Sequence, residues 1–300
     1  MEKKTSLRKF GTDIGIKIFY GFIRMGGQRA AYGLLYFVVF YYLIFSAKAR
    51  ESASHYISRR FPDASSPMRL VHTYKLILNL GQVLIDSAAL SIKGTSAMNP
   101  TCPDKEPLTQ LFNDTRKQQK GVILMISHVG CWQSALSALN FIHMPLNMLM
   151  QISQDHNNYH LLKQKSSTIK VIDADGFLGG SVEIISALGK GEGVAMMGDR
   201  ISNKGDNTLK AKFLGQEARF PYGIFRIASA TGAPIVVLFA RKCGRADYKV
   251  ELARVIRVPR GLGRKKESYQ EFLEIYVSAI ELYCKKFPYQ FFNFYNMWEV

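Results

Sequence analysis

Residues 121–133, GVILMISHVGCWQ, begin with an uninterrupted apolar run and end in a group of small and polar residues. The run at 121–127 is short for a helix, so it predicts a buried strand, and a helix is expected to follow it over 132–141. In open α/β sheets, ligands bind just beyond the carboxyl ends of the strands, where the next helices begin. These residues therefore predict a buried strand of an α/β fold with a candidate site at its carboxyl end.

The alternation of short apolar runs and helical segments continues through the rest of the chain. Further strands are expected over residues 145–151, 168–174, 193–197, 234–241 and 248–258. Further helices are expected over residues 74–90, 158–165, 180–188, 222–230 and 269–286. This order predicts an α/β fold with a mostly parallel central sheet and helices on both of its faces.

The first fifty residues differ in composition from the rest of the chain. Residues 30–47, AAYGLLYFVVFYYLIFSA, carry no charge, and basic residues flank them on both sides. Their length is near the lower limit for crossing a bilayer, which takes about 20 residues, and their aromatic side chains suit the headgroup boundary. We therefore expect residues 1–50 to form hydrophobic or amphipathic helices that anchor the chain, as a single span or within the interface. A buried core helix is the alternative.

The remainder, residues 51–300, is expected to form one domain. A helical lead-in would cover residues 51–110, where prolines punctuate a loop near the end, and the α/β core would cover residues 118–300. The chain of 300 residues is long enough to bury a full core.

The formal net charge of +17 favours an anionic partner, which could be phospholipid headgroups, nucleic acid or an acidic protein. No recognisable nucleic-acid module is present and the aromatic residues are not interleaved with the basic runs, so no nucleic-acid partner is expected. The four cysteines form no C-x-x-C pair, so no metal site is expected either.

The residues after the first strand could carry acid–base chemistry. The imidazole of His128 can take a proton from a hydroxyl near neutral pH. Gly130 would let the backbone approach a substrate closely, and the N-terminus of the following helix could stabilise an oxyanion. Alternatively, Cys131 could be the nucleophile of a papain-like protease, but that fold needs a histidine far downstream, and the last one, His160, lies close behind.

Residues 127–133, SHVGCWQ, resemble the H-x4-[D/E] box of the lysophospholipid acyltransferase superfamily, in the His-x-Gly-x-Trp-Glu form of the lipid A late acyltransferases. Three further blocks resemble that family in the same order. Residues 197–200 resemble its strand-ending Asp block, residues 213–221 with Gly215 its F-x-G-x-x-A block, and residues 288–292 its C-terminal P-x-Q-(aromatic) tail. The resemblance covers nearly the whole chain.

The resemblance implies an enzyme that moves a fatty acyl chain from acyl-carrier protein or acyl-CoA to a hydroxyl of a lipid A-like glycolipid or lysolipid. His128 would be the general base, and Trp132 would line the acyl groove or belong to the core. No cofactor other than the thioester co-substrate is implied. Acyl carrier protein and anionic membrane lipid would be the partners, at the cytoplasmic face of a bacterial inner membrane. The oligomeric state stays open.

Two positions depart from the family pattern. Gln133 replaces the usual acid, and its amide could orient the imidazole without offsetting the imidazolium charge. Asp199 is the candidate substitute because it should follow a neighbouring strand; otherwise the chain is a weakened enzyme or an inactive lipid-binding or scaffold protein. Where the family has an arginine after the 145–151 strand, this chain has Lys163 and Lys165, and Lys163 is a candidate substrate-binding residue. Arg200 and Lys204 are the candidate ligands of a phosphate or of the phosphopantetheine of a carrier.

Overall fold

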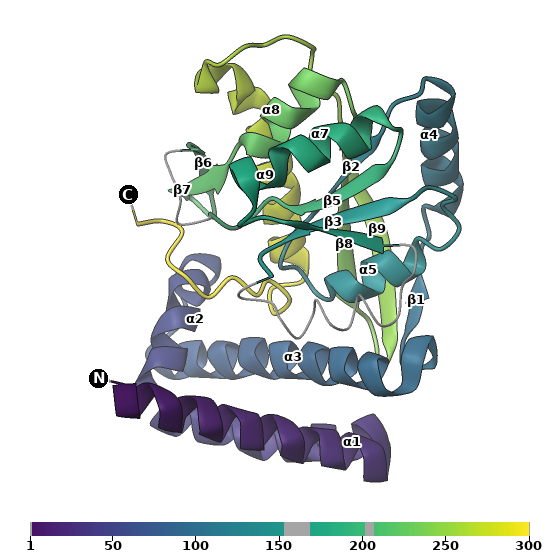
Figure 1. Ribbon diagram of the computed structural model, residues 1–300. Coiled ribbons are helices and arrows are strands. Elements are labelled where there is room, and N and C mark those ends of the chain that lie inside the picture. Colours follow the sequence, from purple (N-terminus) through teal and green to yellow (C-terminus); the bar gives the residue numbers. More distant parts are fainter. Residues whose placement is uncertain (1, 153–168, 202–206, 300) are drawn as a thin grey trace.

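The protein is a layered α/β structure resting on a layer of long helices (Figure 1). The computed structural model describes residues 2–152, 169–201 and 207–299. The main sheet has seven strands in the order β1-β9-β8-β2-β5-β3-β4. Its strands are β1 (Asn99–Thr101), β2 (Val122–Ile126), β3 (Leu146–Met150), β4 (Ile169–Asp173), β5 (Gly193–Met197), β8 (Ile235–Lys242) and β9 (Asp247–Ile256). The pairings are parallel except for β8 with β9, which confirms the predicted mostly parallel sheet.

Strand β2 lies at the centre of the sheet and is buried along its whole length. Its side chains alternate between two apolar cores, as successive residues of a strand must. Ile123 and Met125 belong to one core, whereas Leu124 and Ile126 belong to the other. The uninterrupted apolar run is therefore the signature of a strand that is covered on both faces.

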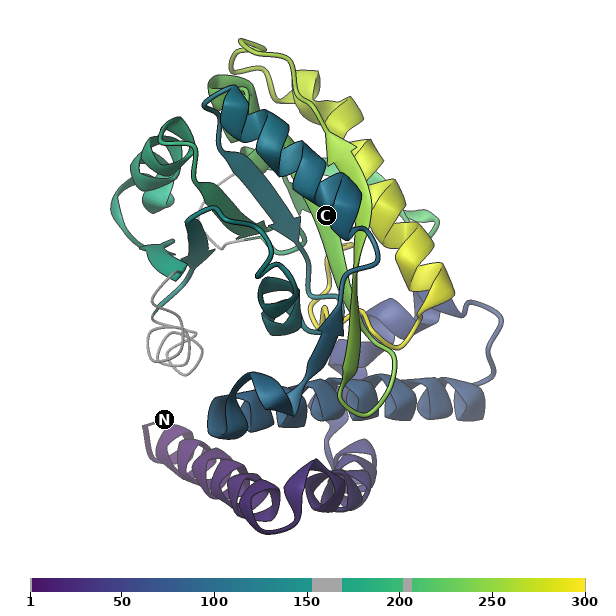
Figure 2. The same ribbon diagram turned by 90° about the vertical axis from the view of Figure 1, so that its right-hand side faces the viewer.

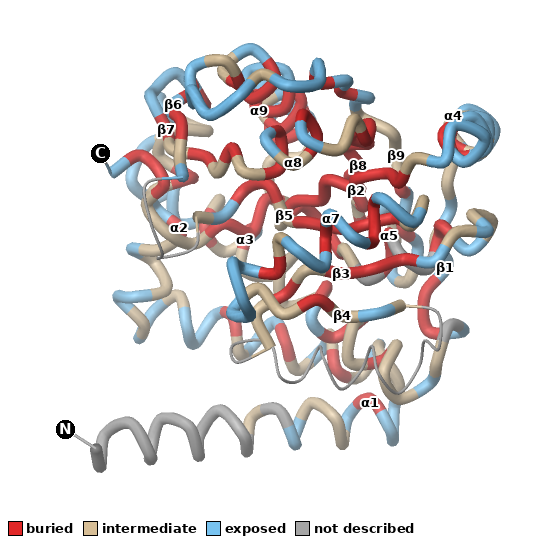
Figure 3. Tube along the Cα trace, turned by 45° about the horizontal axis from the view of Figure 1, so that its top comes forward, coloured by how far each residue is buried: buried red, intermediate tan, exposed pale blue. Residues whose placement is uncertain are grey.

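Helices cover both faces of the sheet, as predicted. The first core contains residues of α7 (Ser181–Gly189), α8 (Gly223–Thr231) and α9 (Gln270–Lys286). The second core contains residues of α4 (Lys105–Lys117) and α5 (Trp132–Ala138). Figure 2 shows α4 and α9 on opposite sides of the strands. The buried residues are accordingly concentrated around the sheet, and the exposed ones lie on the outer helices (Figure 3).

Three N-terminal helices form the layer beneath the sheet: α1 (Glu2–Phe45), α2 (Ala47–Arg60) and α3 (Ser66–Lys93). Helix α1 bends sharply at Gly27, which has a φ of 67°, and packs against α3 through a separate small apolar core. Two helical stretches, Lys17–Phe45 and Ser66–Lys93, are long and apolar enough to cross a membrane by length and composition. The expected anchor at residues 1–50 is therefore helical, and α3 is a second apolar helix beside it.

The apolar stretch of α1 is not a core helix, because only 17% of its most apolar window is buried. Its outward side carries large exposed aromatic side chains, of which Phe37 is 77% and Phe45 is 70% exposed. Such a surface is unusual in a protein surrounded by water alone and is typical of membrane attachment. The domain boundary expected near residue 50 stays a prediction.

Some elements differ from the sequence prediction. The segment with Pro100, Pro103 and Pro107 was expected to be a loop, but β1 pairs with β9 there and α4 starts at Lys105. Pro107 lies in the first turn of α4, where the missing N–H group of a proline costs no helical hydrogen bond. The antiparallel hairpin of β6 (Thr208–Phe213) and β7 (Gln216–Pro221) was not predicted. The helix expected over 158–165 lies outside the described residues.

A buried charge network joins α1 and α3 to the sheet. Asp86 of α3 is fully buried and pairs with the ammonium of Lys242, the last residue of β8, which is also buried. The Asp86 carboxylate also accepts hydrogen bonds from the amide of Gln28 at 2.9 Å and from the hydroxyls of Tyr32 and Tyr248. Gln28 and Tyr32 belong to α1, so the N-terminal helix supplies two of the hydrogen bonds that a buried carboxylate needs.

We expect Asp86→Ala to lower the free energy of unfolding by about 3–5 kcal/mol, because it leaves the Lys242 ammonium buried without its counter-charge. Denaturant titration of the detergent-solubilised protein, followed by circular dichroism, measures this loss. Glu217→Ala is the matched control, because it breaks the Lys210–Glu217 pair, whose side chains are 43% and 67% exposed. That control should cost less than about 1 kcal/mol, and equal losses for the two variants would contradict the prediction.

Candidate active site

His128 and Asp199 come together because two neighbouring strands end side by side. In the parallel pairing of β2 with β5, Ile126 lies opposite Met197, and each strand is followed shortly by one of the two polar residues. The His128 Nδ1 atom is 3.0 Å from Asp199 Oδ1 and 3.2 Å from Oδ2. The His128 main-chain N–H also donates to Asp199 Oδ2 at 2.9 Å. The expectation that Asp199 follows a neighbouring strand is confirmed.

The two side chains lie in different environments. The Asp199 side chain is completely buried, whereas the His128 side chain is 19% exposed. Burial raises the pKa of the Asp199 carboxyl, but the charge and hydrogen bonds of His128 and the charge of Arg200 outweigh it, so the pKa is below its ordinary value. An ionised carboxylate only accepts hydrogen bonds, so the Nδ1 atom of His128 carries the hydrogen and Nε2 is the ring nitrogen that can take a proton.

Gly130 is required by its close contact with β8. Its φ is +59°, and a Cβ atom there would lie 1.8 Å from the carbonyl oxygen of Ala240. The next residue, Cys131, donates its main-chain N–H to that same oxygen at 2.8 Å. The close approach that the sequence predicted is therefore made to the protein's own sheet, and a contact between Gly130 and a substrate stays a prediction.

Helix α5 starts directly after this loop. Trp132 is its first residue and is partly buried against the core that contains α4. The backbone of Gln133 lies in the first turn of α5, but its side chain is not among the described parts of the structure. The Cys131 side chain is fully buried, and its Sγ atom lies 3.7 Å from Ser87 Oγ. A buried thiol does not fit the exposed nucleophile of the papain-like alternative.

Of the remaining candidate residues, the structure describes Arg200 and Gly215. Arg200 is exposed beside Asp199, and its Nη2 atom donates to the carbonyl of Phe292 at 3.2 Å. The lysines named with them lie outside the described residues: Lys163, Lys165 and Lys204. Gly215, with a φ of +85°, lies in the turn between β6 and β7.

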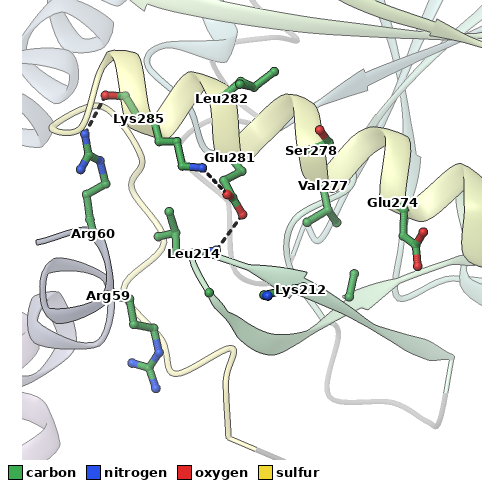
Figure 4. Close-up of a pocket in the computed structure, with 12 residues that line it drawn as sticks. Arg59, Arg60, Lys212, Leu214, Glu274, Val277, Ser278, Glu281, Leu282 and Lys285 are labelled. Carbon is green, nitrogen blue, oxygen red and sulfur yellow. Dashed lines mark hydrogen bonds and ion pairs between the residues drawn. The ribbon is translucent and has the colours of Figure 1, made fainter. Parts of the chain in front are cut away.

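Gly215 lines a cavity of about 610 Å³ between α2, α9 and the β6–β7 hairpin. Arg59 and Arg60 line the same cavity. Figure 4 shows the hydrogen bond that the Arg60 guanidinium donates to the carbonyl oxygen of Lys285. Neither His128 nor Asp199 is among its lining residues. Arg200 therefore lies beside the dyad of His128 and Asp199, whereas Gly215 lies at a cavity that neither residue of the dyad lines.

Two contacts at the dyad were missed by the sequence analysis. The hydroxyls of Ser127 and Tyr276 lie 2.8 Å apart in the core beneath it, and burial raises the pKa of Tyr276 well above its ordinary value. The side chains of Asn293 and Tyr295 both donate to the main-chain carbonyl of Asp199. The resemblance of residues 288–292 to a family block was the only sequence signal near the second contact. In the described part of the chain, no three His, Cys, Asp or Glu residues are grouped as metal ligands would be.

The site lies at the carboxyl ends of β2 and β5, where a buried carboxylate orients a partly exposed imidazole. No curated protein matches the chain. The model of one family, described as "Bacterial lipid A biosynthesis acyltransferase", matches residues 2–298. This match confirms the resemblance drawn from residues 127–133 and the later blocks. The chain therefore belongs to the bacterial lipid A biosynthesis acyltransferase family, whose membership implies that it is an acyltransferase.

Proposed function

We propose that this protein transfers a fatty acyl chain from a thioester donor to a hydroxyl of a lipid A-type glycolipid or a related lysolipid. One observation carries the proposal: the His128–Asp199 dyad, at 3.0 Å, stands at the strand ends of a chain from this acyltransferase family. A partly exposed imidazole oriented by a buried carboxylate is the arrangement expected of a general base.

In the proposed reaction, Nε2 of His128 takes the proton of the acceptor hydroxyl while its oxygen attacks the carbonyl carbon of the thioester. Asp199 accepts the Nδ1 hydrogen bond and stabilises the imidazolium that forms. The tetrahedral intermediate then expels the thiolate, which receives the proton from His128. An ester bond forms and the thioester bond breaks, without a covalent acyl-enzyme and without a metal.

Asp199 also bears on the second candidate function, an inactive lipid-binding or scaffold protein. That candidate arises because Gln133 cannot supply the negative charge of the acid usual in the family's box. The carboxylate of Asp199 reaches the same imidazole from β5 and supplies that charge. The dyad is therefore complete without an acid at position 133, which favours catalysis over a scaffold role.

The charge of the chain and its apolar helices support the choice of partners. The net charge of +17 attracts acidic acyl carrier protein and anionic lipid, with acyl-CoA as the second donor. Arg200, beside Asp199, would bind a substrate phosphate, and Lys163 would contribute to binding of the acceptor. The two apolar helices fit the membrane association of this family, and the basic residues that flank residues 30–47 favour the cytoplasmic face of the inner membrane.

The purified protein in detergent should transfer a labelled acyl chain to a lipid acceptor. We would supply acyl-carrier protein or acyl-CoA loaded with ¹³C-acyl chains, and either a lipid A precursor or a lysophospholipid. Mass spectrometry should then show a product heavier by one labelled acyl group. A strain that lacks the protein should accumulate the corresponding lipid short of one chain. Binding of the lipids without any transfer from either donor would support the scaffold alternative.

A further inference from the structure

The C-terminal segment, residues 287–299 after α9, folds back beneath the active site. It passes between the sheet and α3, where it forms the yellow loop in Figures 1 and 2. The main-chain N–H of Gly130 donates to the carbonyl of Gln290 at 2.9 Å, and the N–H of Phe292 donates to the carbonyl of His128 at 2.7 Å. Val129 and Phe291 form an antiparallel bridge between these bonds. This segment therefore pairs with the catalytic loop as a short strand would.

The same segment holds the other half of the dyad. The carbonyl oxygen of Asp199 accepts hydrogen bonds from Asn293 Nδ2 and from the Tyr295 hydroxyl, both at 3.1 Å. Asn293 is only 3% exposed. The guanidinium of Arg200 adds a bond to the carbonyl of Phe292. One stretch of chain thus fixes the main-chain carbonyls of both His128 and Asp199.

The segment is itself anchored at both of its ends. The side-chain amide of Gln290 exchanges two hydrogen bonds of 2.8 Å with the main chain of Lys242, at the end of β8. At the far end, Trp298 stacks on Phe213 at 5.7 Å and donates its Nε1–H to the Phe213 carbonyl at 3.1 Å. Because both ends are tied to strands, the segment can hold the dyad rather than follow its movements.

We infer that residues 290–295 position the catalytic dyad, with Asn293 and Tyr295 as the positioning residues for Asp199. The inference rests on the proposed function, in which the Asp199 carboxylate must face His128 Nδ1. That orientation depends on the Asp199 main chain, whose carbonyl these two donors hold. Misplacement of a catalytic group by about 1 Å can cost on the order of 10²-fold in rate, so losing the donors should lower turnover without changing substrate affinity.

Tyr295→Phe tests this inference, because it removes one donor and keeps the ring. We expect kcat to fall about 5–10-fold, as expected for one lost hydrogen bond, with KM unchanged. The matched control is Tyr269→Phe, whose buried hydroxyl donates to the carbonyl of Gly263 at 2.7 Å. That variant loses a similar bond elsewhere, so its kcat should stay within about twofold of the original. The pair Tyr295→Phe and Asn293→Leu together should lower kcat about 100-fold.

A double-mutant cycle separates this inference from the proposed function. In an Asp199→Asn background, Tyr295→Phe should cause no further fall in kcat, because residues that act as one unit are not additive. If Tyr295→Phe and Tyr269→Phe have equal kcat values while Asp199→Asn is impaired, the positioning role is wrong and the proposed function stands. If Asp199→Asn itself is unimpaired, the dyad chemistry is wrong and the positioning role goes with it.

Discussion

His128→Ala is expected to lower the rate of acyl transfer by about 10²–10⁴-fold, the range that a general base contributes. Without the imidazole, no group takes the proton of the attacking hydroxyl as its oxygen approaches the thioester. The fold should survive, because the main-chain N–H of residue 128 still donates to Asp199 Oδ2, at 2.9 Å in the structure. Initial rates with a labelled thioester donor measure the loss, and circular dichroism checks the fold.

His143→Ala is the control for this experiment. His143 is exposed and follows α5, so the variant removes an imidazole without touching the dyad. Its rate should equal that of the original protein. If His128→Ala retained a comparable rate, the base would have to be another group, and the proposed reaction would be wrong.

Asp199→Asn should lower kcat about 10³–10⁴-fold, by analogy with the loss of the orienting aspartate in a serine protease triad. The amide has nearly the same shape, but it carries no charge to stabilise the imidazolium, and its NH₂ group can favour the wrong tautomer of His128. The pKa of the Asp199 carboxyl is below its ordinary value, because the charge and hydrogen bonds of His128 and the charge of Arg200 outweigh its burial. The carboxylate therefore stays ionised wherever an ordinary aspartate is ionised. The difference in rate should therefore persist from pH 5 to pH 9.

Two other variants control for this result. Asp63→Asn changes an exposed carboxylate in the turn before α3 and should leave the rate unchanged. Gln133→Glu restores the acid of the family's box and should preserve or raise the rate. A contradicting result would be an Asp199→Asn variant that stays active while Gln133→Ala loses about 10³–10⁴-fold in kcat. In that case Gln133, and not Asp199, would orient His128.

The two residues of the dyad could be predicted because each follows a strand that is recognisable from a short, contiguous apolar run in the sequence. Residues 122–126 and 193–196 are buried on both faces of the sheet, so each strand forms a short apolar run in the sequence. Parallel strands end at the same edge of a sheet, so polar residues that follow them can meet there. The sequence analysis assumed that the two strands are neighbours, and the structure shows that they are, because β5 lies next to β2 in the sheet.

The β6–β7 hairpin could not be predicted in the same way. Its turn residues, Leu214 and Gly215, both have positive φ values. Two-residue turns of this kind are usually signalled by Asn-Gly or Asp-Gly, and a leucine in the first position hides the turn. The strain of that leucine is offset by tertiary contacts, such as the hydrogen bond from its N–H to Glu281 of α9 at 2.8 Å.

The contacts of the C-terminal segment were beyond any local pattern. Asn293 and Tyr295 meet Asp199 across 94 and 96 positions of the sequence. Neither residue belongs to a helix or strand, so no periodicity marks the buried side. A pattern of side chains can predict which residues are buried, but not which distant carbonyl a buried amide or hydroxyl will reach.

The network around Asp86 changes how the N-terminal helix can be treated in practice. Gln28 and Tyr32 of α1 supply two of the hydrogen bonds to that carboxylate. A shortened protein that starts after Phe45, made to avoid detergent, would uncover an ionic centre directly beneath the strands. Helix α1 is thus a structural part of the enzyme as well as a candidate membrane anchor. Removing it to make the protein soluble is therefore expected to destabilise the fold.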